Sequence, residues 1–321
     1  MSIHVRKIRP LVVSVAVAAM VSVVLGACAS AGGRAPATPA VIATSAAPVA
    51  VGTAGDGAAP AIAARPYHLH VPPGYDPAKA TPLVVLLHGY MATGPKQEAY
   101  FGLTPVADAR TFLYAFPDGK KDAHGEQFWN ATPACCDFGK SNVDDVAYLT
   151  AVIDDVSAHH HVDPRRVFVV GHSNGGFMAH RLACALAPRV AAIVSLAGAG
   201  GSEDCTPASP VSVLQIHGDR DTFIRYEGGT IDGAAYPSAR ETVRRWAASD
   251  GCTGDLAPTG ATLDLAREVP GAETRVERTA GCPAGIDVEL WTLIGGKHLP
   301  VVARPGWGEA IYGFLSAHPK P

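Results

Sequence analysis

Short apolar runs rich in β-branched residues alternate along this chain with longer segments of helical period. The runs are YHLHV (67–71), PLVVLLH (82–88), FLYAF (112–116), RVFVV (166–170), AAIVSL (191–196), SVLQIH (212–217) and DVELWTLI (287–294). Several are apolar throughout, which is typical of strands buried on both faces of a parallel sheet. The helical segments are 96–109, 143–159, 175–186, 238–249 and 307–317. This alternation predicts an α/β fold with a mostly parallel central sheet and helices on both faces.

The first residues of the chain stand apart from this pattern. Residues 1–10 are basic, and residues 11–27 are apolar or small with no charge, which is the pattern of a signal peptide. This stretch ends in L-G-A-C at 25–28, which resembles the lipobox of bacterial lipoproteins. We therefore expect a signal peptide over 1–27 and a lipidated Cys28 that anchors the exported protein to the membrane of the bacterial cell envelope. Without lipidation of Cys28, an ordinary signal peptide would leave the protein secreted.

A segment of small residues follows the expected signal peptide. Residues 28–64 are almost entirely Ala, Gly, Pro, Thr, Ser and Val. So few bulky apolar side chains cannot offset the entropy lost on ordering, and we expect a flexible tether. The remaining residues, 65–321, are expected to form one folded domain. The formal net charge of −3 and the lack of a basic run argue against nucleic acid as a partner.

A serine between two glycines follows the fourth apolar run. The sequence G-H-S-N-G at 171–175 lies directly after the strand expected at 166–170 and directly before a helical segment. In this context G-x-S-x-G is a nucleophile elbow, a turn so tight that glycines are needed beside the serine, whose hydroxyl sits on a strained corner. Ser173 is therefore the candidate nucleophile.

An unassisted serine hydroxyl is a poor nucleophile near neutral pH, so this interpretation requires a base and an acid that orients the base. In this fold the acid and then the base follow the serine, each after a later strand. The run SVLQIH is followed by G-D-R-D at 218–221, and DVELWTLI by G-G-K-H at 295–298. We expect Asp221, the last residue of an H-G-x-x-D pattern, to be the acid and His298 to be the base.

Other acids and histidines near these motifs are expected to have structural roles. Asp219 is expected to cap amides in its turn. His172 lies inside the elbow and is expected to point away from the serine, while His180 and His217 are expected to be structural. His88 is expected to shape its loop, with its ring tied to the backbone.

The oxyanion of a tetrahedral intermediate needs backbone donors that are in place before the charge develops. One donor should be the amide of Asn174, directly after the candidate nucleophile. The other should come from the loop after PLVVLLH, where His88-Gly89 looks like the H-G element of such loops and Tyr90 is the expected donor.

Several segments together resemble one family. They are PLVVLLHGY, FPDG with FWNATPACC, VDDVAYLTAVIDDV, GHSNGGFMAHRLAC, IHGDRDTFIRYEGG, DGC and GCPAGIDVELWTLIGGKH, and they extend in the family's order over most of residues 67–315. The resemblance is to the polyhydroxybutyrate depolymerase and feruloyl esterase family of α/β-hydrolases. It implies an α/β-hydrolase fold, ester hydrolysis by Ser173, Asp221 and His298, and no metal or organic cofactor.

The resemblance also bears on the substrate. Trp129 and Asn130 match the family's W-N element and are expected to line the acyl or alcohol pocket, with a core position for Trp129 as the alternative. Members usually have G-G-G-H-x-W-P around the base, whereas this chain has G-G-K-H-L-P at 295–300, without the tryptophan. The chain ends at Pro321 without an appended polymer-binding domain, so soluble esters or oligomers are expected rather than crystalline polymer.

Cysteines are the next feature that bears on compartment and stability. Those that remain after Cys28 are Cys135, Cys136, Cys184, Cys205, Cys252 and Cys282. An exported protein occupies an oxidising compartment, where an even number of cysteines is compatible with disulfides. The connectivity stays open, and Cys252 with Cys282 is the pair we expect, because each lies in a glycine-flanked loop. None has the paired C-x-x-C spacing of a structural zinc site.

Two polar clusters have simpler interpretations than a binding site. The histidines at 159–161 are expected to form a solvated helix cap rather than a set of metal ligands. The acidic pairs at 144–145 and 154–155 are expected on the solvated side of a helix. For the first pair, which matches the family motif, bracing of the active-site face is the alternative.

The sequence thus predicts a lipid-anchored serine hydrolase that forms an acyl-enzyme with short-chain, hydroxyalkanoate-oligomer or hydroxycinnamoyl esters. Two alternatives stay open. One is an envelope lipoprotein that binds a glycan or lipid in the same cleft without catalysis, and the other is a serine peptidase. The complete triad argues against binding alone, and no segment suggests a pocket for a peptide amino terminus.

Overall fold

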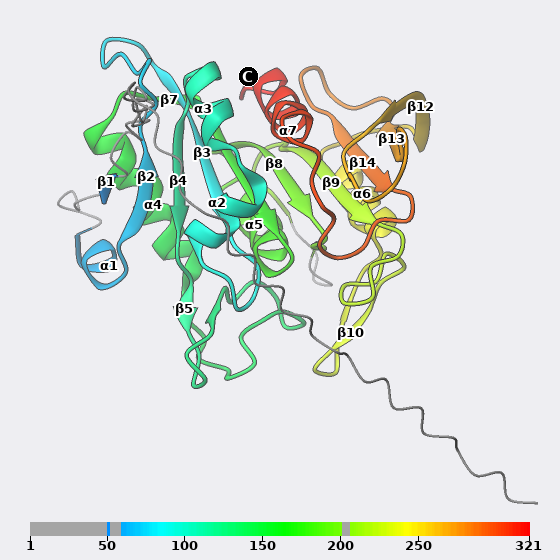
Figure 1. Ribbon diagram of the computed structural model, residues 1–321, viewed down its shortest axis with the longest axis horizontal. Helices are drawn as coiled ribbons and strands as arrows, with labels where there is room; N and C mark the ends of the chain where they lie inside the picture. Colours follow the sequence, from blue (N-terminus) through cyan, green and yellow to red (C-terminus); the bar gives the residue numbers. More distant parts are fainter. Residues whose placement is uncertain (1–49, 52–58, 201–205) are drawn as a thin grey trace, which may run out of the picture. The chain divides into compact units, whose positions relative to one another are not determined.

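The computed structural model describes residues 50–51, 59–200 and 206–321 of the chain (Figure 1). Every described residue belongs to one compact unit. The expected signal peptide, Cys28, most of the expected tether and Cys205 lie outside the described residues. Within the described ranges, no helix combines the length and apolarity needed to cross a membrane.

In the described part of the chain, ten strands form one mixed sheet (Figure 1). Across the sheet they are β1 (Ala50–Val51), β2 (Tyr67–His70), β4 (Leu113–Pro117), β3 (Thr81–Leu87), β7 (Val162–His172), β8 (Val190–Leu196), β9 (Ser212–Gly218), β14 (Val288–Leu293), β13 (Thr274–Thr279) and β12 (Leu256–Leu263). The strands from β4 to β14 are parallel, whereas the pairs at both ends of the sheet are antiparallel. The predicted mostly parallel sheet is therefore confirmed.

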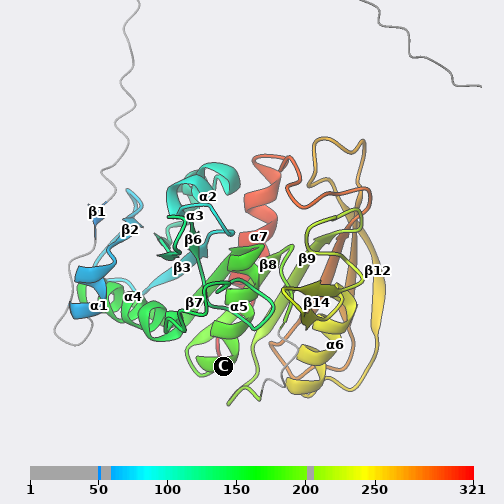
Figure 2. The ribbon, with the colours of Figure 1, turned by 90° about the horizontal axis from the view of Figure 1, so that it is seen from below.

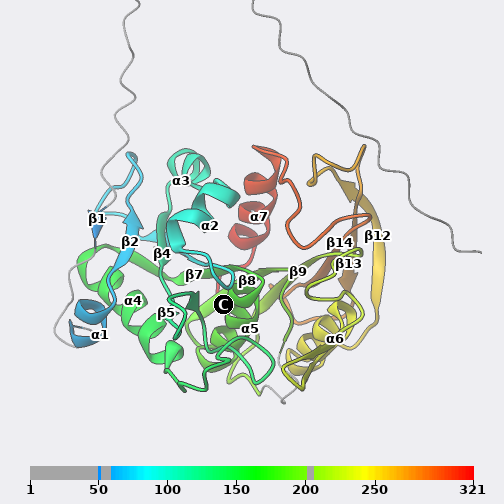
Figure 3. The same ribbon diagram turned by 60° about the horizontal axis from the view of Figure 1, so that its bottom comes forward.

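Helices cover both faces of this sheet (Figures 2 and 3). On one face lie α2 (Gly94–Phe101), α3 (Thr104–Arg110) and α7 (Gly306–Ala317), and on the other lie α1 (Ala59–Ala64), α4 (Asp145–His159), α5 (Asn174–Ala185) and α6 (Ala239–Ser249). Two small hairpins, β5 (Lys120–Lys121) with β6 (Gln127–Phe128) and β10 (Gly229–Ile231) with β11 (Ala234–Tyr236), extend from loops. The arrangement is that of the α/β-hydrolase fold.

The two layers of helices explain why the central strands are apolar throughout. Successive side chains of a strand point to opposite faces of the sheet. In β3, Val85 packs with the helices α4 and α5, while Val84 and Leu86 pack with α2 and α7. Every residue of this strand is buried, so the strand lacks the alternation of polar and apolar residues that a strand with one exposed face has.

Two helical segments differ from the sequence prediction. The helix expected at 96–109 is two helices, because Gly102 adopts a left-handed conformation with φ 64° and ends α2. The second difference lies inside the expected tether, where α1 forms at its end and buries Ile62 in the core. This Ala-rich segment thus contributes to the fold because it carries one large apolar side chain, that of Ile62, which packs in the core.

The acidic pairs of α4 were expected in solvent, and for two of their members this is wrong. Asp145 is fully buried and accepts a 2.7 Å hydrogen bond from the Arg65 guanidinium. Asp155 is also buried and accepts a 2.5 Å hydrogen bond from the Tyr67 hydroxyl. Arg65 lies just before β2 and Tyr67 is its first residue, so the helical period of α4 alone could not indicate these partners.

Two disulfides join described cysteines. Cys252 and Cys282 are bonded, as the sequence predicted, and connect the end of α6 to the loop after β13. The other disulfide joins the adjacent residues Cys135 and Cys136 in the loop between β6 and α4. That loop passes beside the elbow, where Cys135 Sγ lies 3.5 Å from Asn174 Nδ2.

Candidate active site

Ser173 lies between β7 and α5 in the conformation that a nucleophile elbow requires. Its φ is 53° with ψ −119°, a strained combination for a residue with a side chain. A Cβ placed on Gly171 would lie 2.1 Å from the Gly175 carbonyl oxygen, and one on Gly175 would lie 2.1 Å from the Leu87 carbonyl oxygen. Both glycines are therefore needed because the backbones pack in direct contact around the serine.

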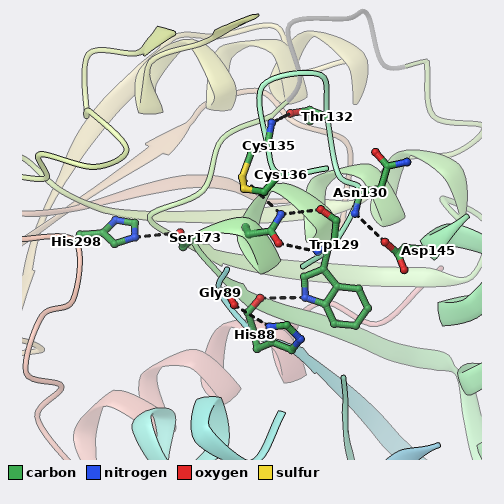
Figure 4. The surroundings of a disulfide bond; sticks show 11 residues. His88, Gly89, Trp129, Asn130, Thr132, Cys135, Cys136, Asp145, Ser173 and His298 are labelled. Atoms are coloured by element: carbon green, nitrogen blue, oxygen red, sulfur yellow. Dashed lines mark hydrogen bonds between the residues drawn. A yellow bond between two sulfur atoms is a disulfide. The ribbon is translucent and has the colours of Figure 1, made fainter. Parts of the chain in front are cut away.

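His298 reaches Ser173 from the loop after β14 (Figure 4). Its Nε2 lies 3.0 Å from the Ser173 Oγ, and its Nδ1 lies 2.7 Å from an oxygen of Asp221. A carboxylate can only accept, so Nδ1 carries the proton and Nε2 is left to accept the serine proton. The structure thus joins these residues in one chain of hydrogen bonds.

Asp221 lies in the loop after β9 with its carboxylate fully satisfied. One oxygen accepts hydrogen bonds from the amides of Phe223 (2.8 Å) and Ile224 (3.0 Å), and the other faces His298. Burial alone would raise the pKa of this carboxyl, but hydrogen bonds from His217 and His298 outweigh burial and hold the pKa well below its usual value. Asp221 is consequently ionised throughout the neutral range.

The other histidines near the triad occupy structural positions. His172 is buried, its Nε2 donates to the His298 carbonyl oxygen at 3.1 Å, and burial lowers its pKa to about 3. His217 donates to the Ile224 carbonyl oxygen at 2.8 Å, which supports the acid loop. His180 lies in α5 between Gln215 and Trp246, away from the nucleophile. The sequence did not indicate that His172 supports the base loop.

Asp219, the rival acid, makes a different contact. Its Oδ1 accepts a 2.6 Å hydrogen bond from the Gly295 amide at the start of the base loop. It therefore caps a turn, as expected, although the turn belongs to the neighbouring loop rather than to its own. Two of the histidines at 159–161 are likewise tied to the backbone, since His159 Nδ1 donates to the Asp155 carbonyl oxygen and His161 Nδ1 to the Pro77 carbonyl oxygen. Among the described residues, no three His, Cys, Asp or Glu side chains gather as a metal site.

The two expected oxyanion donors lie on either side of the serine. Asn174 is the first residue of α5, directly after Ser173. Tyr90 follows Gly89, and a Cβ on Gly89 would lie 3.4 Å from the Ser173 Cβ, so this loop is in contact with the elbow. The Tyr90 hydroxyl donates to Asp122, which directs the side chain toward the β5–β6 hairpin. Their amides are thus near the nucleophile, and their catalytic role is a proposal made below.

Trp129 takes the core position that the sequence left open as the alternative to a pocket. Its side chain is fully buried, and its indole Nε1 donates a 3.0 Å hydrogen bond to the His88 carbonyl oxygen. Asn130 is partly exposed and borders a cavity of about 860 Å³ beside α5 and α6, which Arg181 and Trp246 also line. Neither Ser173 nor His298 lines that cavity. Trp129 therefore belongs to the core beneath the active-site loops.

Exposed apolar side chains lie close in sequence to the acid and to the base, as Phe223 and Leu299 show. Among the described residues, the large apolar side chains with high exposure are Met91, Phe138, Phe223, Ile294, Leu299 and Val301. Met91, Phe223, Ile294, Leu299 and Val301 lie in loops that follow β3, β9 and β14 at the edge of the sheet where the serine is placed, and Phe138 follows β6 and packs against Tyr90. The ring of Phe223, 73% exposed, has its centroid 5.2 Å from that of His298. We call these six side chains the apolar rim. Phe223, an aromatic residue two positions after the expected acid, is the sequence signal that could have indicated this rim.

Known proteins of similar sequence carry the names of esterases. A family model described as Esterase PHB depolymerase matches residues 65–246. Feruloyl esterase B of Piromyces equi is 29% identical over 246 residues, which is 74% of this chain and 43% of that protein. NocK of Nocardia uniformis subsp. tsuyamanensis, which carries the name of an esterase, is 30% identical over 246 residues, 73% of this chain and 70% of that protein.

Solved structures resemble this chain in fold. An acetyl xylan esterase from Aspergillus awamori superposes with a TM-score of 0.54 at 16% identity, covering 78% of this chain and 94% of that one. At this identity the likeness establishes the α/β-hydrolase fold alone.

The contrast between Asp221 and Asp219 generates a paired test of the acid's identity. We expect Asp221→Asn to lower kcat by about 10³–10⁴-fold, because an amide cannot hold the imidazole in the required tautomer or stabilise its cation. Asp219→Asn keeps an acceptor for the Gly295 amide and should stay within about tenfold of wild type. Steady-state kinetics on a p-nitrophenyl ester measures both, and an equal loss in the two variants would contradict the assignment.

Proposed function

The chain belongs to the esterase PHB depolymerase family, and we propose that it is a carboxylic-ester hydrolase in which Ser173, His298 and Asp221 hydrolyse the ester through an acyl-enzyme. The observation that carries this proposal is the hydrogen-bonded chain from the serine Oγ through the imidazole to the ionised carboxylate. It lies on a strained elbow at the carboxyl ends of parallel strands, where α/β folds place their reactive groups.

The first half of the reaction is acylation. His298 Nε2 takes the proton from Ser173 Oγ as the oxygen attacks the ester carbonyl carbon. The negative charge that develops on the carbonyl oxygen is stabilised by the backbone amides of Asn174 and Tyr90. When the intermediate collapses, the bond to the alcohol oxygen breaks and the imidazolium returns its proton to that oxygen. The alcohol leaves, and the acyl group stays on the serine.

The second half is deacylation by water. His298 takes a proton from the water as it attacks the acyl carbonyl, and the same amides hold the second oxyanion. Collapse releases the carboxylic acid and returns the proton to Ser173. Asp221 stays ionised in both halves because hydrogen bonds keep its pKa low, so it stabilises each imidazolium that forms.

The proposed substrates are esters with apolar groups on at least one side of the scissile bond. Short-chain esters, hydroxyalkanoate oligomers and hydroxycinnamoyl esters are the classes we propose, since similar proteins are named feruloyl esterases and the family model is named for polyhydroxybutyrate. The apolar rim supports this class, because Phe223 and Leu299 are exposed beside the base. Leu299 directly follows His298, near the tryptophan position of the family motif.

Ser173→Ala tests the proposal directly. We expect turnover to fall by roughly three to six orders of magnitude, because the attacking oxygen is lost while binding is kept. The assay is hydrolysis of acetyl and butyryl p-nitrophenyl esters, hydroxybutyrate oligomers and methyl ferulate by residues 59–321. A fluorophosphonate should label wild type and leave the variant unlabelled. Retention of most of the activity by a folded variant would refute the proposal.

We also propose that the protein is exported and anchored through a lipidated Cys28. Support comes from the basic and apolar leader, the lipobox-like L-G-A-C and the disulfide between Cys252 and Cys282, which fits an oxidising compartment.

Substitution of the proposed lipidation site gives a clear readout. We expect Cys28→Ser, expressed with its leader in a bacterium that processes lipoproteins, to lose incorporation of a labelled fatty acid, because the thiol that accepts the lipid is gone. Wild type should be labelled and recovered with membranes. Labelling of both forms to the same extent would contradict the anchor.

A further inference from the structure

Trp129 contacts both backbone segments that are proposed to stabilise the oxyanion (Figure 4). Its main chain forms hydrogen bonds with the side chain of Asn174. Its indole N–H donates a hydrogen bond to the backbone carbonyl of His88, which precedes Gly89-Tyr90. The sequence allowed either a pocket or a core position for this tryptophan, and its full burial corresponds to the core position. Its position beneath both donors indicates another role.

The link to the first donor is a pair of hydrogen bonds. The Asn174 Oδ1 accepts from the Trp129 amide at 2.7 Å, and the Asn174 Nδ2 donates to the Trp129 carbonyl oxygen at 2.9 Å. The side-chain amide thus pairs with the main chain of Trp129 as a neighbouring strand would. Because Asn174 is the first residue of α5, this pair fixes the turn of backbone that carries the proposed donor N–H.

The link to the second donor runs through His88. The Gly119 amide donates to His88 Nε2 at 2.8 Å, so Nδ1 carries the proton and donates to the Gly89 carbonyl oxygen, also at 2.8 Å. Burial lowers the pKa of His88 to about 4, so the ring is neutral near pH 7, as this tautomer requires. The Gly89 carbonyl and the Tyr90 N–H belong to one planar trans peptide, so a bond that fixes one end orients the other in the opposite direction.

The indole of Trp129 completes this link by holding the carbonyl of His88 at 3.0 Å. Its ring also lies against the His88 ring, with centroids 4.9 Å apart. One buried residue therefore contacts the backbone before the second donor and the side chain after the nucleophile.

Trp129 is itself held from the side away from the serine. The next amide, that of Asn130, donates to Asp145 at 2.7 Å, and Asp145 also accepts from Arg65. The Arg65 guanidinium lies 3.5 Å from the centroid of the Tyr148 ring and 5.4 Å from that of Trp129. The Cys136 amide donates to the Trp129 carbonyl oxygen at 3.2 Å, which joins the loop of the Cys135–Cys136 disulfide to the same residue.

We propose that Trp129 is a positioning residue that holds the amides of Asn174 and Tyr90 at the separation the oxyanion requires. The inference rests on the proposed serine mechanism. Donors fixed before the reaction cost no reorganisation when charge develops, so this support acts on the transition state and not on the bound ester. Its loss should lower kcat and leave KM nearly unchanged.

Two variants break the two links separately. Trp129→Phe keeps an aromatic ring and removes the N–H that holds His88. Asn174→Ala removes both bonds to Trp129 and keeps the backbone N–H that is the proposed donor. We expect each variant to lower kcat roughly ten- to hundredfold and to keep KM within about threefold of wild type. The loss should not exceed that caused by removal of an oxyanion donor itself.

The chain offers a matched control in Trp307 of α7. This tryptophan is also fully buried, but its indole N–H has no hydrogen-bond partner among the residues that the structure describes. Trp307→Phe therefore makes the same change of volume without the loss of a hydrogen bond. We expect its kcat within about twofold of wild type, whatever it does to the melting temperature.

A transition-state analogue separates positioning from general damage. An alkyl trifluoromethyl ketone adds to a serine and forms a hemiketal oxyanion, so its Ki should rise in Trp129→Phe and Asn174→Ala by the factor by which kcat/KM falls. Fluorophosphonate titration corrects every rate for the fraction of competent sites. Three results after this correction would each overturn the inference. The first is a kcat and a Ki equal to those of wild type in both variants, and the second is a rise in KM alone. The third is a loss of kcat in Trp307→Phe equal to that in Trp129→Phe.

The same experiment distinguishes this inference from the proposed function. If the wild type hydrolyses esters and depends on Ser173, while the Trp129 and Asn174 variants keep their rates, only the positioning role fails. If hydrolysis by the wild type does not depend on Ser173, the serine mechanism fails and the positioning role fails with it.

Discussion

The backbone of Ser173 is the constraint on which the active edge of this molecule depends. A residue with a side chain held at φ 53° between a strand and a helix needs its neighbours to approach without Cβ atoms. Gly171 and Gly175 meet that need, since a Cβ on either would lie 2.1 Å from a backbone oxygen. The consequence is a serine that projects from the sheet, with its hydroxyl free to meet groups from other loops.

Parallel pairing brings those groups to the same place. Strands β9 and β14 are neighbours in register, with Gly218 opposite Leu293, so the loops that follow them leave the sheet side by side. The contact is close, because a Cβ on Gly218 would lie 2.3 Å from the Gly296 carbonyl oxygen. In this way Asp221 and His298, which are 77 residues apart in sequence, form a hydrogen bond of 2.7 Å. Beneath them, Trp129 holds the loops proposed to bind the oxyanion.

The sequence predicted the parts that depend on local pattern and chain order. The seven apolar runs became strands, and the elbow, acid and base motifs stand in one hydrogen-bonded chain, because each lies directly after a strand of the parallel sheet. It did not predict β12 and β13, whose sequences LAPTGATL and TRVERT lack a continuous apolar run because they lie at the antiparallel edge of the sheet. It also expected Asp145 in solvent and did not decide between pocket and core for Trp129, because the positions of both residues depend on partners distant in sequence. The local sequence around Trp129 does not distinguish a tryptophan that lines a pocket from one that is buried in the core.

The most direct test of this account is to look for the acyl-enzyme itself. Residues 59–321 would be mixed rapidly with p-nitrophenyl butyrate, quenched in acid and analysed by intact mass and peptide mapping. The account predicts a burst of p-nitrophenol and a butyryl group on the peptide that contains Ser173. Steady hydrolysis with no acyl group on that peptide at any quench time, or with the acyl group on another residue, would contradict it.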